Sequence, residues 1–163
     1  MDLTCVHPCV RLIHFKPLSL GASASILAAM QLVIVRHAEA APGSPDELRR
    51  LTPAGRDQAR SLGLRLREQG IEPDAVVSSP LLRARETAAA LSSLLGLGDP
   101  EVDERLAPGA SPADIRDAAR SHGETVVVVG HQPDCGAAAA ALVGGPEPAF
   151  PPCGHVLLEL GAE

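Results

Sequence analysis

Short apolar runs alternate with segments of helical periodicity along most of the chain, and this alternation limits the possible folds more than any other feature. The runs at 32–35 and 125–129 are apolar on both faces, with Thr125 at the start of the second as the one polar residue, which is typical of strands that are buried on both faces. Strands of this kind, separated by helices, predict a sheet that is covered by helices on both sides. We therefore expect the α/β class, as a three-layer α/β/α sandwich with a mostly parallel central sheet.

The helical segments carry clear start and stop residues. Thr52 suits an N-cap, Pro53 the first helical position and Gly70 the end of the first helix. Ser111 and Pro112 stand in the same way at the front of a later helix. Besides the two buried strands and the helix within 51–70, we expect strands within 74–79, 101–106 and 155–160, and helices within 80–96, 111–123 and 133–145.

Length and composition indicate one working domain. The 163 residues, 45% of them hydrophobic, are enough to bury a sizeable core. Arg11, His14 and Lys16 interrupt the only apolar stretch near the N-terminus that a signal peptide would need. We expect residues 1–29 to be an N-terminal extension, either disordered or the result of a mis-assigned start, and residues 30–163 to form a single domain.

Composition also excludes several functions. With two Phe, no Trp, no Tyr and a net charge of −6, the chain lacks the stacking side chains and the basic surface that nucleic-acid binding uses. No apolar run reaches the length of a membrane span. The four cysteines, at positions 5, 9, 135 and 153, show no paired metal-ligand spacing, so we expect a cytoplasmic protein with reduced thiols.

Reactive side chains follow three of the expected strands. In chain order they are Arg36, His37, Ser79, Arg83 and His131. In open α/β sheets, ligands bind beyond the carboxyl ends of the strands. If these strands are neighbours, two arginines and two histidines therefore meet at one edge of the sheet.

Such a cluster suits phosphoryl transfer. Arginine forks bind phosphate oxygens, the helix start after Ser79 favours an anion, and a neutral histidine can attack phosphorus. A second, protonated histidine would donate to the charge that develops on the phosphoryl oxygens. The arginines supply the charge that a metal would otherwise provide, and the chain has neither the HxH nor the HExxH pattern of a zinc hydrolase. We expect neither a metal nor a cofactor.

Each residue also has an ordinary structural interpretation. Taken alone, Arg36 would be a solvated strand end and His131 a strand cap. Arg83 would be a helix-surface residue paired with Glu86 or Thr87. The placement of all of them after strands is what favours a phosphate site.

Four motifs resemble those of the histidine phosphatase superfamily, which includes the cofactor-dependent phosphoglycerate mutases. They are VRHAEA at 35–40, LTPAGRDQA at 51–59, SSPLLRARETA at 78–88 and VVVVGHQP at 126–133. The run DELRRLTPAG at 46–55 and the short length resemble the SixA-type phosphohistidine phosphatases, minimal members without a helical insertion over the active site. Ala38 replaces the family's usual Gly. Arg50 replaces the subgroup's Pro, and either adds charge beside the site or points to solvent.

The resemblance implies a phosphoglycerate mutase-like fold and a role for each matching residue. His37 would be the phosphorylated nucleophile, and Arg36, Arg83 and His131 would complete the phosphate pocket. Glu104 is a candidate proton donor, because larger members place a Glu in that segment; the alternative is an ordinary surface acid. We also expect Ser79 and Arg49 to contribute to substrate binding.

Together these observations predict a metal-independent phosphatase that acts through a phosphohistidine intermediate. The preferred substrate is a phosphorylated protein, such as a histidine-phosphotransfer domain, because an uncovered pocket admits a side chain from another surface. One alternative is a phosphomonoesterase of small phosphorylated metabolites, such as sugar or nucleotide phosphates. The other is a phosphate-binding module without catalysis.

Overall fold

The computed structural model describes residues 29–161. The predicted extension over residues 1–29 lies outside this range except for its last residue, so the extension and the domain start at Met30 stay predictions. The strands are β1 (Met30–Arg36), β2 (Ala75–Ser78), β3 (Glu101–Val102), β4 (Thr125–Gly130) and β5 (His155–Leu160). The helices are α1 (Pro53–Glu68), α2 (Leu82–Leu94), α3 (Pro112–Arg120) and α4 (Asp134–Val143), with the short 3-10 helices η1 (Asp46–Leu48) and η2 (Glu104–Leu106).

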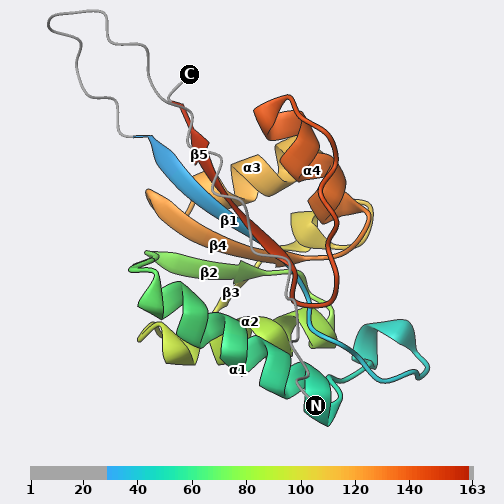
Figure 1. Cartoon of the computed structure of the whole chain (residues 1–163). Helices are drawn as coiled ribbons and strands as arrows, with labels where there is room; N and C mark the ends of the chain where they lie inside the picture. Colours follow the sequence, from blue (N-terminus) through green and yellow to red (C-terminus); the bar gives the residue numbers. More distant parts are fainter. Residues whose placement is uncertain (1–28, 162–163) are drawn as a thin grey trace, which may run out of the picture.

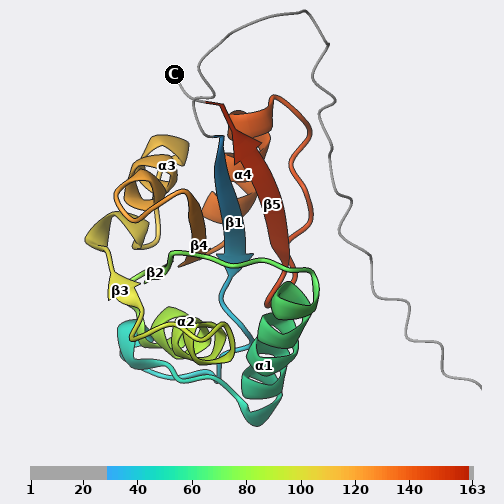
Figure 2. The same cartoon turned by 90° about the vertical axis from the view of Figure 1, so that its left-hand side faces the viewer.

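The strands of the described range form one five-stranded sheet in the order β3-β2-β4-β1-β5. β1 and β2 both pair in parallel with β4, so the three strands that precede the reactive residues are neighbours. β3 also pairs in parallel with β2, whereas β5 pairs antiparallel with β1. The sheet is therefore mostly parallel, as predicted. Figures 1 and 2 show α3 and α4 on one face of the sheet and α1 and α2 on the other. The α/β/α sandwich is thus confirmed.

Adjacent residues of the central strands belong to different halves of the core. Leu32 and Ile34 pack in the cluster that contains the α3 and α4 residues, whereas Val33 and Val35 pack in the cluster of α1 and α2. Because successive strand side chains point to opposite faces, a strand covered on both sides needs apolar residues at every position. This explains why the runs at 32–35 and 126–129 contain no polar residue.

Local signals place most element boundaries where the sequence predicts them. The Thr52 side chain accepts a hydrogen bond from Gly55 N at 2.9 Å, and Gly70 has a φ of 73° just beyond the end of α1. Ser111 and Asp114 form a capping box at the start of α3. β1 is longer than its apolar run, because it pairs with a strand on each side. None of the helices within residues 29–161 combines the length and apolar character that a bilayer crossing requires.

Candidate active site

The carboxyl ends of β1, β4 and β2 lie side by side at one edge of the sheet (Figure 1). Main-chain hydrogen bonds continue the ladder past the strand ends, from His37 N to Gly130 O at 3.0 Å and from Ser79 N to Val129 O at 3.0 Å. These bonds fix the main chain of the residues that directly follow β1 and β2. The ring centroids of His37 and His131 are 5.2 Å apart as a result.

The tautomer of His37 is set by the main chain. Its Nδ1 lies 2.7 Å from Ala38 O. A carbonyl oxygen only accepts hydrogen bonds, so Nδ1 carries the proton and Nε2 of the neutral ring keeps its lone pair. Burial, together with the positive charge of Arg83 and Arg36, lowers the pKa of His37 to about 4. At neutral pH, His37 therefore presents an unprotonated Nε2.

Arg83 holds this nitrogen from the first turn of α2. Its Nε donates to His37 Nε2 at 3.2 Å. Its terminal nitrogens donate to Asp46, Nη1 to the main-chain oxygen at 2.9 Å and Nη2 to Oδ2 at 3.1 Å. Arg83 is only 6% exposed, so the helix-surface interpretation of this residue is wrong.

His131 faces the same space. Its Nε2 lies 2.7 Å from Ser79 Oγ, whereas its buried Nδ1 has no hydrogen-bond partner. Burial, with the neighbouring His37 and Arg83, lowers the pKa of His131 to about 3. Among these neighbours the imidazole of His131 stays neutral at neutral pH, because burial and nearby cations disfavour its charged form. That it donates as a protonated ring to a phosphoryl group stays a prediction.

The side chain of Arg36 forms a hydrogen bond with the loop that precedes β5. Its Nη1 donates to Phe150 O at 2.8 Å, and its buried Nε has no partner. Among the side chains of residues 29–161, Arg36 Nε and His131 Nδ1 are the buried polar atoms that lack a hydrogen bond. Buried polar groups are normally satisfied, so these two atoms can bond to a polar group that enters the cluster.

Two of the sequence motifs form hydrogen bonds and contacts with the main chain that follows His37. In the motif at 78–88, Thr87 Oγ1 accepts from Ala38 N at 3.0 Å and donates to Arg83 O at 2.8 Å. In the motif at 51–59, Gln58 Oε1 accepts from Glu39 N at 2.9 Å, and Gly55 packs directly against the Glu39 carbonyl. Both motifs therefore hold the main chain immediately after His37.

The remaining residues discussed in the sequence analysis are Glu104, Arg49, Arg50 and Ser79, and their environments differ from one another. Glu104 is exposed at the start of η2, and within the described range no side-chain hydrogen bond or ion pair joins it to the cluster. Arg49 donates to Ala41 O and to Asp46 Oδ1, at 2.8 Å and 2.9 Å. The Arg50 side chain is 73% exposed and lies 3.7 Å from Glu86, so it points to solvent. Ser79 is fully buried and contacts His131.

Two residues that hold the site, Asp46 and Phe150, are not among the predicted site residues. Asp46 belongs to the motif at 46–55, and its position three residues before Arg49 is a signal for an ion pair. Phe150 contributes its main-chain carbonyl. Since every residue type has a carbonyl, this contact cannot be predicted from the sequence. The 3-10 helix η1, which carries Asp46, was not predicted either.

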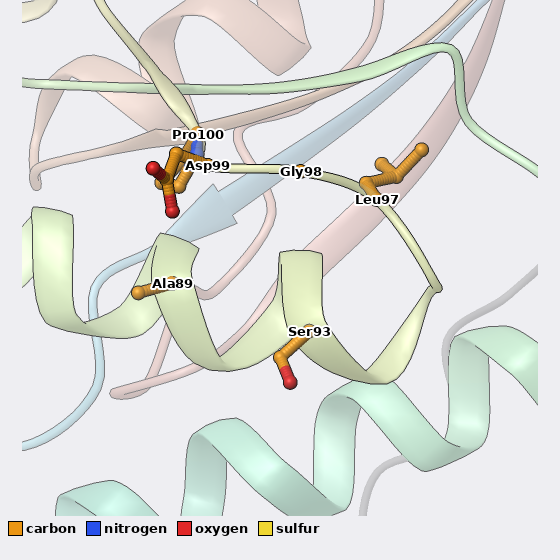
Figure 3. A pocket seen from close by; sticks show the side chains of 6 residues that line it. All are labelled: Ala89, Ser93, Leu97, Gly98, Asp99 and Pro100. Atoms are coloured by element: carbon orange, nitrogen blue, oxygen red, sulfur yellow. The ribbon is translucent and has the colours of Figure 1, made fainter.

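A separate hollow of about 450 Å³ lies along the second half of α2 (Figure 3). It is lined by Ala89, Ser93, Leu97, Gly98, Asp99 and Pro100. It contains one carboxylate and no histidine or arginine, so it lacks the chemistry of the edge cluster. Nowhere in residues 29–161 do three or more His, Cys, Asp or Glu side chains gather as metal ligands would.

Comparison with known proteins shows the family of the chain. The sequence model of the histidine phosphatase superfamily (branch 1) matches residues 32–108. An uncharacterized protein of Picosynechococcus is 35% identical over 135 residues, 78% of each chain. The phosphohistidine phosphatase SixA of Escherichia coli is 33% identical over 125 residues, 73% of this chain and 78% of that protein. A structure of the protein histidine phosphatase SixA complexed with tungstate has a TM-score of 0.69 and 31% identity, covering 76% of this chain and 84% of that one. The chain belongs to the histidine phosphatase superfamily.

Proposed function

We propose that the protein is a phosphatase of phosphohistidine on protein partners and that it works through a phosphorylated His37. Its family makes it a phosphatase, and so a hydrolase. The observation that carries the mechanism is the hydrogen bond from His37 Nδ1 to Ala38 O, which leaves Nε2 unprotonated beside Arg83. An unprotonated imidazole nitrogen is a nucleophile toward phosphorus.

The reaction proceeds in two displacements. In the first, His37 Nε2 bonds to phosphorus, the bond from phosphorus to the substrate's imidazole nitrogen breaks, and that imidazole takes up a proton from solvent. In the second, water attacks phosphorus, the bond to His37 breaks, inorganic phosphate leaves and one proton of the water returns to solvent. The net change is the hydrolysis of phosphohistidine to histidine and phosphate, with no other reactant.

The donor groups of the two arginines suit the phosphoryl oxygens. Arg36 Nε and Arg83 Nε donate to them, and their charges offset the negative charge of the transition state. The negative phosphoryl group also raises the pKa of His131, so that this histidine becomes a donor when the site is filled. Glu104 stays a candidate acid; an imidazole leaving group reduces the need for one.

Three observations support a protein substrate. The relative from Escherichia coli is a phosphohistidine phosphatase by name. The described elements that lie wholly between Arg83 and His131 are β3, η2, α3 and β4, and α3 packs against α4, η2 and β4. His37 itself is only half-buried. A side chain on another protein's surface therefore has access to it.

The test compares substrates on the purified full chain in the presence of a metal chelator. We expect kcat/KM for a histidine-phosphotransfer domain carrying phosphohistidine to exceed that for every member of a sugar, nucleotide and aryl phosphate panel by at least about tenfold. A metabolite that is hydrolysed better would make the enzyme a small-molecule phosphatase. Phosphate binding without turnover of any substrate would make it a binding module.

A further inference from the structure

Arg83 depends on a group outside its own helix for its orientation. An arginine side chain has four rotatable bonds and loses considerable rotamer entropy when it is fixed. α2 contributes little, because Glu86, the acid nearest to Arg83 on α2, uses its carboxylate on Leu51 N at 2.8 Å and faces Arg50. Of the ion pairs within residues 29–161, the one that includes Arg83 is with Asp46.

Asp46 contacts Arg83 at two points. Its main-chain oxygen accepts from Nη1 and its Oδ2 accepts from Nη2, at 2.9 Å and 3.1 Å. Two contacts on the terminal nitrogens of a planar group fix the direction of the third nitrogen, Nε. That nitrogen is the one that donates to His37 Nε2.

The carboxylate is itself held from the other side. Asp46 Oδ1 accepts from Arg49 Nη1 at 2.9 Å, and Arg49 Nε donates to Ala41 O at 2.8 Å. The hydrogen bonds with Arg49 and then Arg83 keep the pKa of Asp46 below its usual range, so this carboxylate stays charged at neutral pH. A chain of contacts thus runs from the loop after β1, through Arg49 and Asp46, to Arg83.

We propose that Asp46 is a positioning residue, which aims the Arg83 guanidinium at the phosphoryl group on His37 and does not itself touch the substrate. The proposal rests on the proposed function, since it assigns Arg83 to the phosphoryl group. Asp46 occupies the two terminal nitrogens of Arg83 and leaves the Nε edge toward the nucleophile. The carboxylate therefore orients the arginine without competing for the phosphoryl-binding edge.

The experiment measures kcat and KM for an aryl phosphate, and the Kd of inorganic phosphate, in Asp46→Ala and Asp46→Asn. We expect kcat/KM of Asp46→Ala to fall by about tenfold or more, because misdirected charge-assisted hydrogen bonds weaken transition-state binding. Asp46→Asn, which keeps one acceptor oxygen without the charge, should lie between Asp46→Ala and the parent. Glu47→Ala is the matched control: Glu47 is the next residue of η1, exposed and without a side-chain hydrogen bond or ion pair among the described residues, and its variant should stay within about twofold of the parent.

A double-mutant cycle separates positioning from other roles. In an Arg83→Lys background, Asp46→Ala should cost less than about twofold further, because Asp46 acts through the guanidinium. A fully additive loss, or an unchanged kcat/KM in Asp46→Ala, would overturn the proposal. So would a loss confined to the phosphohistidine protein, since Asp46 would then be a partner contact. If the parent hydrolyses the aryl phosphate but not phosphohistidine, the proposed substrate fails while the aryl phosphate series still decides the role of Asp46. If it hydrolyses neither, the phosphate Kd series decides it.

Discussion

Arg83 Nε donates a hydrogen bond to His37 Nε2 across 3.2 Å, joining two residues 46 positions apart in the sequence. A permanently charged donor on this nitrogen opposes its protonation, because the ring would have to accept a proton where it already accepts a hydrogen bond. The same geometry places the guanidinium beside any group that becomes bonded to Nε2. The contact therefore both keeps the nucleophile neutral and prepares its product.

The first prediction concerns the protonation of His37. Because its pKa is lowered from 6.5 to about 4, the ring should remain in the Nδ1–H tautomer throughout the range in which an ordinary histidine becomes charged. Nitrogen NMR shifts followed from pH 7 downward, assigned with a His37→Asn variant, would show this. A titration midpoint close to 6.5 would contradict the burial of the ring.

The same shifts fix the sign of the pH dependence of stability. In the unfolded chain, His37 and His131 regain a pKa near 6.5, so the unfolded state binds more protons than the folded state between about 4 and 6.5 through His37 and between about 3 and 6.5 through His131. The free energy of unfolding should therefore rise as the pH increases through these windows and fall when the solution is acidified. Urea unfolding at stepped pH values measures it. The double variant His37→Asn/His131→Asn should flatten the dependence; an unchanged slope would assign the effect to other groups.

Thr87→Val should impair both stability and catalysis. Valine keeps the shape of Thr87 but leaves the buried Ala38 N–H without its acceptor, which typically costs about 1–3 kcal/mol. Since Ala38 O fixes the His37 ring, kcat should fall as well. Thr87→Ser, which retains the hydroxyl, serves as the control and should keep most of the activity. Equal unfolding energies for all three proteins would show that the hydroxyl is dispensable.

Gly55→Ala should disturb the chain after His37. A Cβ at Gly55 would clash with the main-chain carbonyl of Glu39, and we expect a loss of about 1–3 kcal/mol in the free energy of unfolding. Gly98→Ala is the matched control, because no atom lies within 4 Å of a Cβ there. Its effect should stay within about 0.5 kcal/mol. If both variants unfold alike, the close packing of α1 against Glu39 carries no energetic weight.

The sheet and the central cluster could be predicted because they depend on residue type. A strand that is apolar at every position must be covered on both faces, and parallel neighbours bring their carboxyl ends together. Arg36, His37, Arg83 and His131 follow from that rule alone. The structure then adds the contacts between Arg83 and His37 and between the two histidine rings.

The finer features depend on main-chain positions and on burial, which residue types do not reveal. The acceptors for His37 Nδ1 and Arg36 Nη1 are the carbonyls of Ala38 and Phe150, and any residue type supplies a carbonyl. The neutral state of His131 results from the depth of its burial among cations. Sequence spacing gives no access to that depth, so the lowered pKa of His131 could not be predicted.

The central claim is that the phosphoryl group passes through His37 Nε2. A single-turnover reaction with ³²P-labelled phosphohistidine protein or aryl phosphate, quenched in alkali to preserve phosphoramidates, tests it most directly. Mass spectrometry of the digested enzyme should locate an acid-labile, alkali-stable phosphate on His37, and His37→Ala should show neither the label nor turnover. Label on a different residue, or turnover retained by His37→Ala, would contradict the mechanism.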